Sequence, residues 1–162
     1  MAKPHVLNIN EEDYEFALLG LSILKDQYET AISINKTLFI ALELNNNFSL
    51  ALKDNKLFRF SLFSYFDKEF AIEYLLIPNV SNFEEPNINT AGSTDLFSEL
   101  PVEERSLLIK ELPKTDYFLI LKGEEIEGHK HKVIQLLKNM DDVLSIQLID
   151  VTDLPSRSNL VF

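Results

Sequence analysis

Two histidines lie in the only cluster of this sequence that has the residue types of a metal site. His129 and His131 are one residue apart, and Glu124, Glu125 and Glu127 precede them. On a strand the two imidazoles would share a face, but here they fall at the start of a predicted helix. Residues two apart on a helix point about 200° apart, so both cannot reach one ion. The sequence therefore predicts a polar helix entry and no metal site.

Asp116 and Tyr117 are the best-placed residues for acid–base chemistry. The chain has 26 acidic residues, so carboxylates meet by chance, and only burial gives one of them a strongly shifted pKa. Asp116 lies between a turn at Pro113 and a predicted buried strand, with Tyr117 directly after it. We expect Asp116 to bond nearby main-chain amides while Tyr117 packs its ring. A catalytic role is the alternative.

Asn35 and Arg59 are two further candidates, because each is a polar residue within an apolar segment. Either could line a pocket, although such residues more often pair locally at a boundary. The chain contains no cysteine, and its glycines at 123 and 128 are separated by acidic residues. That loop therefore lacks the features of a phosphate cradle. We assign no catalytic, cofactor-binding or metal-binding residue and expect no cofactor.

Hydrophobic periodicity and turn residues predict the elements that position these candidates. A central feature is a strand, a polar loop, an amphipathic helix and a second strand over residues 115–150. The segment 38–44 fits either the end of a helix or the start of a strand. Predicted strands are 5–8, 15–22, 48–52, 57–66, 69–77, 117–122 and 143–151, and predicted helices are 25–37, 101–112 and 129–140.

The order of these elements predicts an α+β fold. A strand–helix–strand unit occurs near each end of the chain, with antiparallel strands between them. We expect a mainly antiparallel sheet packed with the helices as a two-layer sandwich, ferredoxin-like in order with extra central strands. At 162 residues and 46% apolar composition, the chain fits a single domain over 1–162. Residues 79–100 form an irregular acidic loop in this prediction.

Charge and hydropathy limit the partners of this protein. Its net charge is −11, and residues 69–104 contain no lysine or arginine. Such a surface repels phosphate backbones and anionic membranes, so nucleic acid is not an expected partner. No apolar run approaches the roughly 20 residues needed to cross a bilayer, and the first residues do not form a secretory signal. We expect a soluble cytoplasmic protein.

Six short segments resemble the IPExxVDY family, small bacterial proteins found mainly in Bacteroidota. They are Leu18-Leu19-Gly20-Leu21 with Asp26-Gln27-Tyr28, then Ile34-Asn35-Lys36, Tyr74-Leu75-Leu76-Ile77-Pro78-Asn79, Asp116-Tyr117-Phe118-Leu119, and Ser158-Asn159-Leu160-Val161-Phe162. Asp116 and Tyr117 match the last two residues of the motif that gives the family its name. The resemblance implies a cytoplasmic bacterial protein and supplies no activity or site residues.

These observations favour a non-catalytic protein-interaction or regulatory domain that forms a homodimer, with another protein as a further candidate partner. Phe63 and Tyr65 lie on the strand face opposite Phe58 and Phe60, so both faces of that strand need cover. A partner subunit or the middle loop would supply it. The alternative is a small-ligand-binding or enzymatic domain with a pocket beside the strand–helix–strand units. We also expect the apolar C-terminal residues 160–162 to dock onto the domain.

Overall fold

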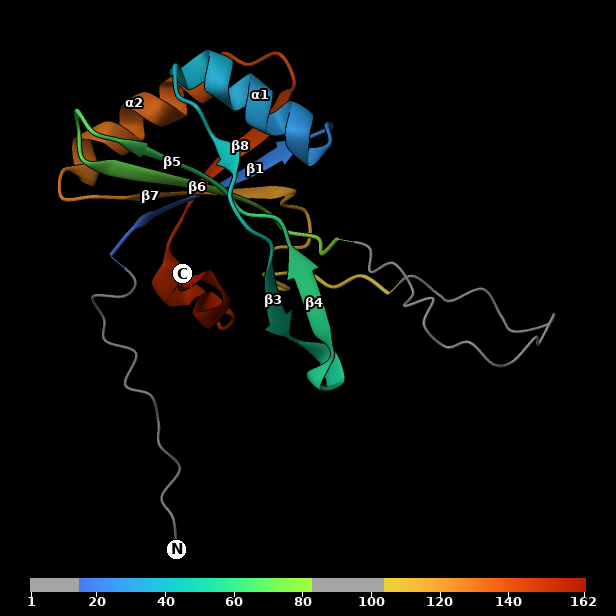
Figure 1. Cartoon of the computed structure of the whole chain (residues 1–162). Coiled ribbons are helices and arrows are strands. Elements are labelled where there is room, and N and C mark those ends of the chain that lie inside the picture. The colour runs from blue at the N-terminus through green and yellow to red at the C-terminus, as the bar shows by residue number, and fades with distance from the viewer. Residues whose placement is uncertain (1–14, 83–103) are drawn as a thin grey trace, which may run out of the picture.

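The computed structural model describes residues 15–82 and 104–162. Its centre is a six-stranded antiparallel sheet of order β2-β5-β6-β7-β1-β8, with a separate two-stranded ribbon of β3 and β4. Two helices cover one face of the large sheet (Figure 1). The predicted α+β fold with a mostly antiparallel sheet is confirmed. The elements are β1 (Ala17–Ile23), α1 (Gln27–Leu38), β2 (Glu43–Leu44), β3 (Phe48–Ala51), β4 (Leu57–Phe60), β5 (Phe63–Asp67), β6 (Ile72–Pro78), β7 (Tyr117–Lys122), α2 (Ile126–Lys138) and β8 (Val143–Ile149).

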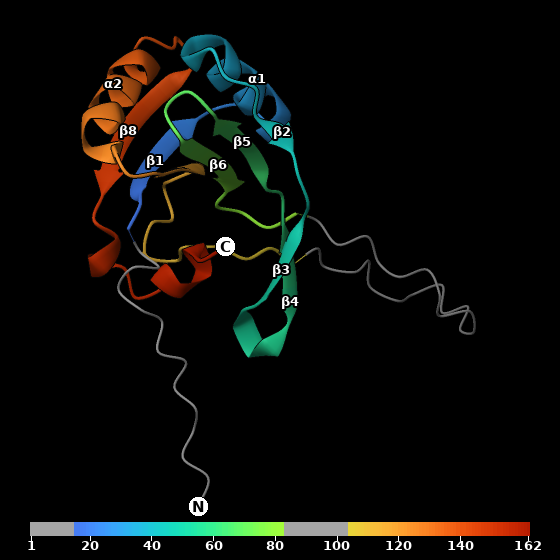
Figure 2. The same ribbon diagram turned by 60° about the vertical axis from the view of Figure 1, so that its left-hand side comes forward.

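The central strands are buried on both faces, as their nearly continuous apolar sequences predict. In β7, Leu119 and Leu121 pack into the core beneath the helices, whereas Phe118 and Ile120 pack into a second core on the other face. That second face is covered by the β3–β4 ribbon and the C-terminal turns (Figure 2). The chain therefore covers both faces of the central strands with its own residues.

Helix α1 is capped at its N-terminus by Asp26 and at its C-terminus by Phe39. Asp26 is its N-cap, and its side chain accepts hydrogen bonds from the backbone N–H groups of Tyr28 and Glu29 at 2.8 and 2.9 Å. Phe39 ends the helix in the left-handed conformation, with φ 56°. The segment 38–44 thus contains both predicted structures, because the helix includes Leu38 and the last two residues form β2.

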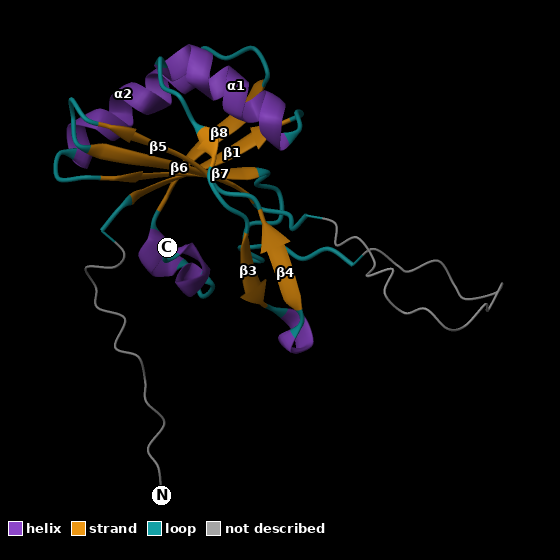
Figure 3. Cartoon of the chain, in the orientation of Figure 1, coloured by secondary structure: helices purple, strands orange, loops and turns teal. Residues whose placement is uncertain are grey.

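The prediction of one strand over residues 57–66 is wrong. The structure divides it into β4 and β5, which belong to different sheets (Figure 3). Phe60 fills the core below the large sheet, while Phe63 enters the core beneath the helices. Between them, Ser61 and Leu62 connect the two sheets, and the Leu62 carbonyl accepts a hydrogen bond from Asn45 N–H at 2.8 Å. Phe60 and Phe63 would also face opposite sides of one continuous strand. The break shows instead in the pairing, because β4 pairs with β3 whereas β5 pairs with β2 and β6.

The prediction of a helix over residues 101–112 is also wrong for its described part, which begins at Glu104. Residues 104–116 form turns, with a bridge between Leu107 and Val80. Backbone groups that a helix would need bond elsewhere: the Ser106 N–H donates to the Ser81 hydroxyl at 2.9 Å, and the Leu108 N–H donates to the Asn79 carbonyl at 2.7 Å. The predicted strand 5–8 and the loop residues 83–100 lie outside the described residues.

The C-terminal residues dock onto the domain, as predicted. Leu160 is fully buried in the core below the sheet. The Phe162 ring meets the Phe48 ring edge-on, with centroids 4.8 Å apart. The preceding residues form two short 3-10 helices, Val151–Asp153 and Arg157–Leu160. Among the described residues, neither α-helix is long and apolar enough to cross a membrane.

Candidate functional site

Asp116 fastens three strands together at one end of the sheet. Its carboxylate accepts a hydrogen bond from the backbone N–H of Ile23 at 2.9 Å, across 93 residues of sequence. Its own N–H donates to the Leu21 carbonyl at 2.9 Å, and its carbonyl accepts from Asn79 N–H at 2.8 Å. The side chain is exposed. These contacts confirm that Asp116 bonds main-chain amides, and they give its carboxylate a structural role.

Tyr117 lies beside Asp116 with its ring buried. Its hydroxyl donates a hydrogen bond to the Lys25 carbonyl at 2.5 Å, which joins the start of β7 to the entry of α1. Burial raises the pKa of Tyr117 above its ordinary value of 10.0. The phenol is therefore neutral at physiological pH and is held as a hydrogen-bond donor.

Asp116 and Tyr117 line a hollow of about 650 Å³ at this end of the sheet. Several of its polar side chains already have bonding partners within the chain. Lys25 pairs with Asp142 at 2.6 Å and bonds Ser33 at 3.1 Å, and the hydrogen bond to Asp142 raises the pKa of Lys25. Asp26 caps α1. The hollow is lined by Ile23, Lys25, Asp26, Gln27, Tyr28, Pro78, Val80, Ser81, Asn82, Arg105, Asp116 and Tyr117.

Asn35 and Arg59 do not line this hollow. The Asn35 amide makes two hydrogen bonds to the main chain of Leu42: it donates to the carbonyl at 3.1 Å and accepts from the N–H at 2.7 Å. It thereby holds the segment after α1 against the helix. Arg59 is exposed on β4, opposite Ser49 in the ribbon. The structure therefore brings together two of the four predicted candidates and gives Asn35 a local structural role.

Asn79 is an important polar residue that the sequence analysis did not select. It is fully buried at the end of β6. Its side-chain amide donates to the carbonyls of Leu112 and Thr115 at 2.9 and 3.0 Å, and its side-chain oxygen accepts from Ile109 N–H at 2.9 Å. The available signal was an asparagine directly after the apolar run that ends at Pro78, where a polar side chain needs buried partners.

The two histidines of the cluster lie in different surroundings: His129 contacts other side chains, whereas His131 is exposed to solvent. His129 Nε2 lies 3.1 Å from the Tyr74 hydroxyl, and the His129 ring is 5.0 Å from that of Phe70. His131 is exposed on α2. Over residues 15–82 and 104–162, no group of three or more histidine, aspartate or glutamate side chains has the arrangement of a metal site.

No family model, curated protein or solved structure matches this chain. The case for a function therefore rests on the chemistry and geometry of the described residues.

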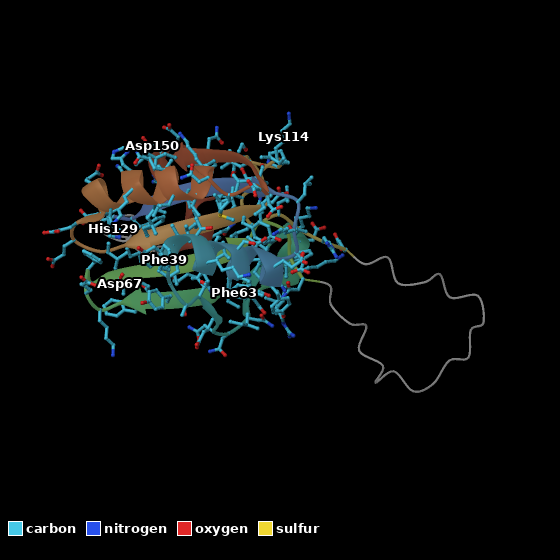
Figure 4. The ribbon with its side chains drawn as sticks, turned by 90° about the horizontal axis from the view of Figure 1, so that it is seen from above. Phe39, Phe63, Asp67, Lys114, His129 and Asp150 are labelled. Atoms are coloured by element: carbon cyan, nitrogen blue, oxygen red, sulfur yellow. The ribbon has the colours of Figure 1, made fainter. Side chains whose placement is uncertain are left out.

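An apolar patch on the outer side of α1 is the feature least explained by the stability of the domain. Tyr28, Ile32 and Phe39 follow one another at helical spacing and are 53%, 53% and 88% exposed. The Tyr28 ring meets the Phe63 ring edge-on at 5.7 Å, and Leu44 of β2 pairs with Phe63 in the sheet. Figure 4 shows Phe39 and Phe63 on the α1 side of the molecule. We call Tyr28, Ile32, Phe39 and Leu44 the α1 surface.

Proposed function

We propose that this protein is a non-catalytic protein-interaction or regulatory domain that self-associates through the α1 surface. Phe39 carries the proposal. A bulky residue with positive φ costs of the order of 1 kcal/mol or more, and a Phe39 ring that is 88% exposed gains little from burial in the single chain. A phenylalanine in this position stabilises the protein only when a partner covers its ring.

A second copy of the chain is the partner that the charges of α1 favour. Glu29 lies in the first turn and Lys36 in the last, and at 100° per residue both fall on the same side of the apolar stripe. Two α1 helices packed antiparallel about a two-fold axis would bring Glu29 close to Lys36 of the partner subunit, twice. Helix α1 is neutral in sum, whereas the chain carries −11. The repulsion between two acidic molecules is therefore smaller at this surface than the net charge of −11 implies.

Light scattering after size-exclusion chromatography at micromolar concentration tests this proposal. We expect a species of twice the 18.7 kDa chain mass, and we expect Ile32→Glu to convert it to the single chain. Leu57→Glu is the matched control, because Leu57 is an exposed apolar residue of the separate ribbon. A wild-type protein that elutes only as a single chain, or equal effects of both variants, would overturn the proposal.

A small-ligand-binding or enzymatic domain remains the second candidate, and the hollow beside Asp116 and Tyr117 favours it. Its volume of about 650 Å³ lies within the range of ligand pockets. Against it, Asp26, Lys25 and Tyr117 each bond a structural partner. A ligand would have to displace these bonds. Loss of a bound metabolite from Tyr117→Phe protein, with folding unchanged, would support this candidate.

The wider assignments belong to the same proposal. Membership of the IPExxVDY family is supported by the residues quoted above, since three of their segments coincide with parts of β1 and β6 and with the start of β7. A ferredoxin-like order is supported by the arrangement β6-β7-β1-β8 within the sheet, and a two-layer sandwich by the helices on one face. We propose a cytoplasmic, single-domain bacterial protein that binds neither nucleic acid nor membranes, consistent with its charge of −11.

A further inference from the structure

Strand β8 presents an open, uncharged edge. It is the last strand on its side of the sheet and pairs only with β1 among the described residues. Its seven residues, VLSIQLI, contain no charge and no proline. Leu144 and Leu148 are 65% and 47% exposed. Proteins usually block such an edge with charges, prolines or a covering segment, because its unpaired N–H and C=O groups can bind another strand.

The part of β8 that can accept a strand is residues 145–149. The pairing of β1 with β8 shifts between Ser22 and Ile23, so that Ser145 and Val143 face consecutive residues of β1 and Leu144 is extra. This bulge distorts the edge near its start. From Ser145 onward the register is regular, and Leu148 faces the helix side of the sheet opposite Leu19. An added strand could therefore pair with the backbone of the five regularly spaced residues 145–149.

Acidic residues surround both ends of this edge. Asp141 and Asp142 precede β8 and Asp150 follows it, and Figure 4 shows Asp150 on the side of the molecule where α2 and β8 lie. Leu148 and Asp150 line a hollow of about 860 Å³. It is also lined by Glu15, Glu124, Glu127 and Lys130. The edge is thus apolar in the middle and negative at its ends.

In the described part of the chain, nearby lysines pair with only two of these acids. Lys25 pairs with Asp142 at 2.6 Å, and Lys130 pairs with Glu127 at 2.5 Å. Asp150, Glu15 and Glu124 remain as additional negative charges. Hydrogen bonds from the Thr152 side chain and backbone lower the pKa of Asp150 and favour its ionised form. A partner that brings positive charge to the ends of the edge would be favoured.

We propose that β8 binds, by strand addition, an extended protein segment that is apolar at alternate positions and has basic residues at its ends. Main-chain hydrogen bonds would supply affinity, and the side-chain pattern would supply selectivity. A second copy of β8 is disfavoured there. An antiparallel pair centred on Ile146 would place Asp150 against Asp142 of the partner subunit, twice. This site is therefore separate from the α1 surface and does not depend on it.

Two labelled peptides test the proposal on the full chain. The first alternates valine and threonine and has an arginine at each end; the second is identical but has glutamates at its ends. We expect fluorescence anisotropy to show binding of the first peptide only, weakened by added salt. We also expect hydrogen exchange of residues 145–149 to slow when it binds. Equal binding of both peptides, or binding without protection of β8, would overturn the proposal.

A charge-reversal variant adds a matched test. Glu124→Lys should lower the affinity for the arginine peptide about two- to fivefold and raise the affinity for the glutamate peptide. Glu69→Lys is the control, because Glu69 is also an exposed turn residue but lies between β5 and β6. If both variants act equally, the effect is one of net charge and the proposed site is wrong. If Leu148→Lys abolishes self-association, the edge is occupied by a second copy, which would also overturn the proposal.

Discussion

The side-chain oxygen of Asn79 accepts a hydrogen bond from the backbone N–H of Ile109 at 2.9 Å, and both residues are fully buried. With its bonds to Leu112 and Thr115, Asn79 fixes a segment without regular secondary structure against the end of β6. That segment leads directly into Asp116. The position of the candidate site therefore depends on one buried amide.

Asn79→Ala should lower the free energy of unfolding by about 2–4 kcal/mol, because it leaves buried main-chain groups without partners. Urea denaturation measures the change. Asn46→Ala, at an exposed turn, is the control and should alter stability by less than about 0.5 kcal/mol. Equal stabilities of the two variants would contradict the role assigned to Asn79.

Asn79→Asp should make stability depend on pH. An ionised carboxylate has the same shape but cannot donate to the Leu112 and Thr115 carbonyls, so burial there raises the pKa of the new carboxyl in the folded state. The folded variant then favours the protonated form. Its deficit relative to wild type should grow as pH rises from about 4 to 7. Parallel urea titrations across that range provide the measurement, and a constant deficit would contradict the prediction.

Phe39→Gly should weaken the dimer without destabilising the single chain. Glycine adopts positive φ without strain, so unfolding of the single chain should cost up to about 1 kcal/mol more than in wild type. The ring lost from the α1 surface should raise the dissociation constant of the dimer. Urea unfolding of dilute protein and light scattering at higher concentration separate the two effects. Phe39→Tyr keeps a ring and should retain the dimer; a clear loss of single-chain stability in Phe39→Gly would argue against this account.

Leu160→Ala should destabilise the domain by about 2–4 kcal/mol, since Leu160 is fully buried below the sheet. Phe162→Ala should cost less, because the Phe162 ring is 42% exposed and its ring contact is with Phe48. Thermal unfolding of both variants, together with a chain lacking residues 159–162, measures the contribution of the docked terminus. An unchanged midpoint in the truncated chain would show that the docked terminus adds no stability.

Stability should fall at alkaline pH because of Tyr74. Burial raises the pKa of Tyr74 from 10.0 to about 12 in the folded state. The neutral Tyr74 phenol therefore adds its full contribution to the free energy of unfolding below the unfolded pKa near 10. This contribution, up to about 2–3 kcal/mol, is lost as pH rises toward 12. Tyr74→Phe should be less sensitive to pH between 9 and 11, and urea midpoints across that range would show it. An identical pH profile in both proteins would exclude Tyr74 as the cause.

Local sequence signals predicted most of the elements. Asp26, directly before residues with helical apolar spacing, predicted the start of α1. The prediction of 117–122 matches β7, because a short strand that is apolar except for its last residue and lies between polar turns has few alternatives. The helix predicted over 101–112 failed in its described part, where hydrogen bonds to Asn79 and Ser81 override local propensity. Likewise, the alternation of residues 57–66 placed Phe60 and Phe63 on opposite faces but did not reveal that the strand ends between them and that its two halves join different sheets.

The sequence by itself determined the α+β class, the acidic charge and the docking of the C-terminus, because these follow from composition, period and the cost of exposing apolar residues. The structure alone decided which residues meet: Asp116 bonds Ile23 across 93 residues, and Phe39 lies exposed at positive φ. Within residues 15–82 and 104–162, it also leaves the outer edge of β8 without a paired strand. Long-range pairing depends on the energy of the whole fold, which no short window of sequence contains.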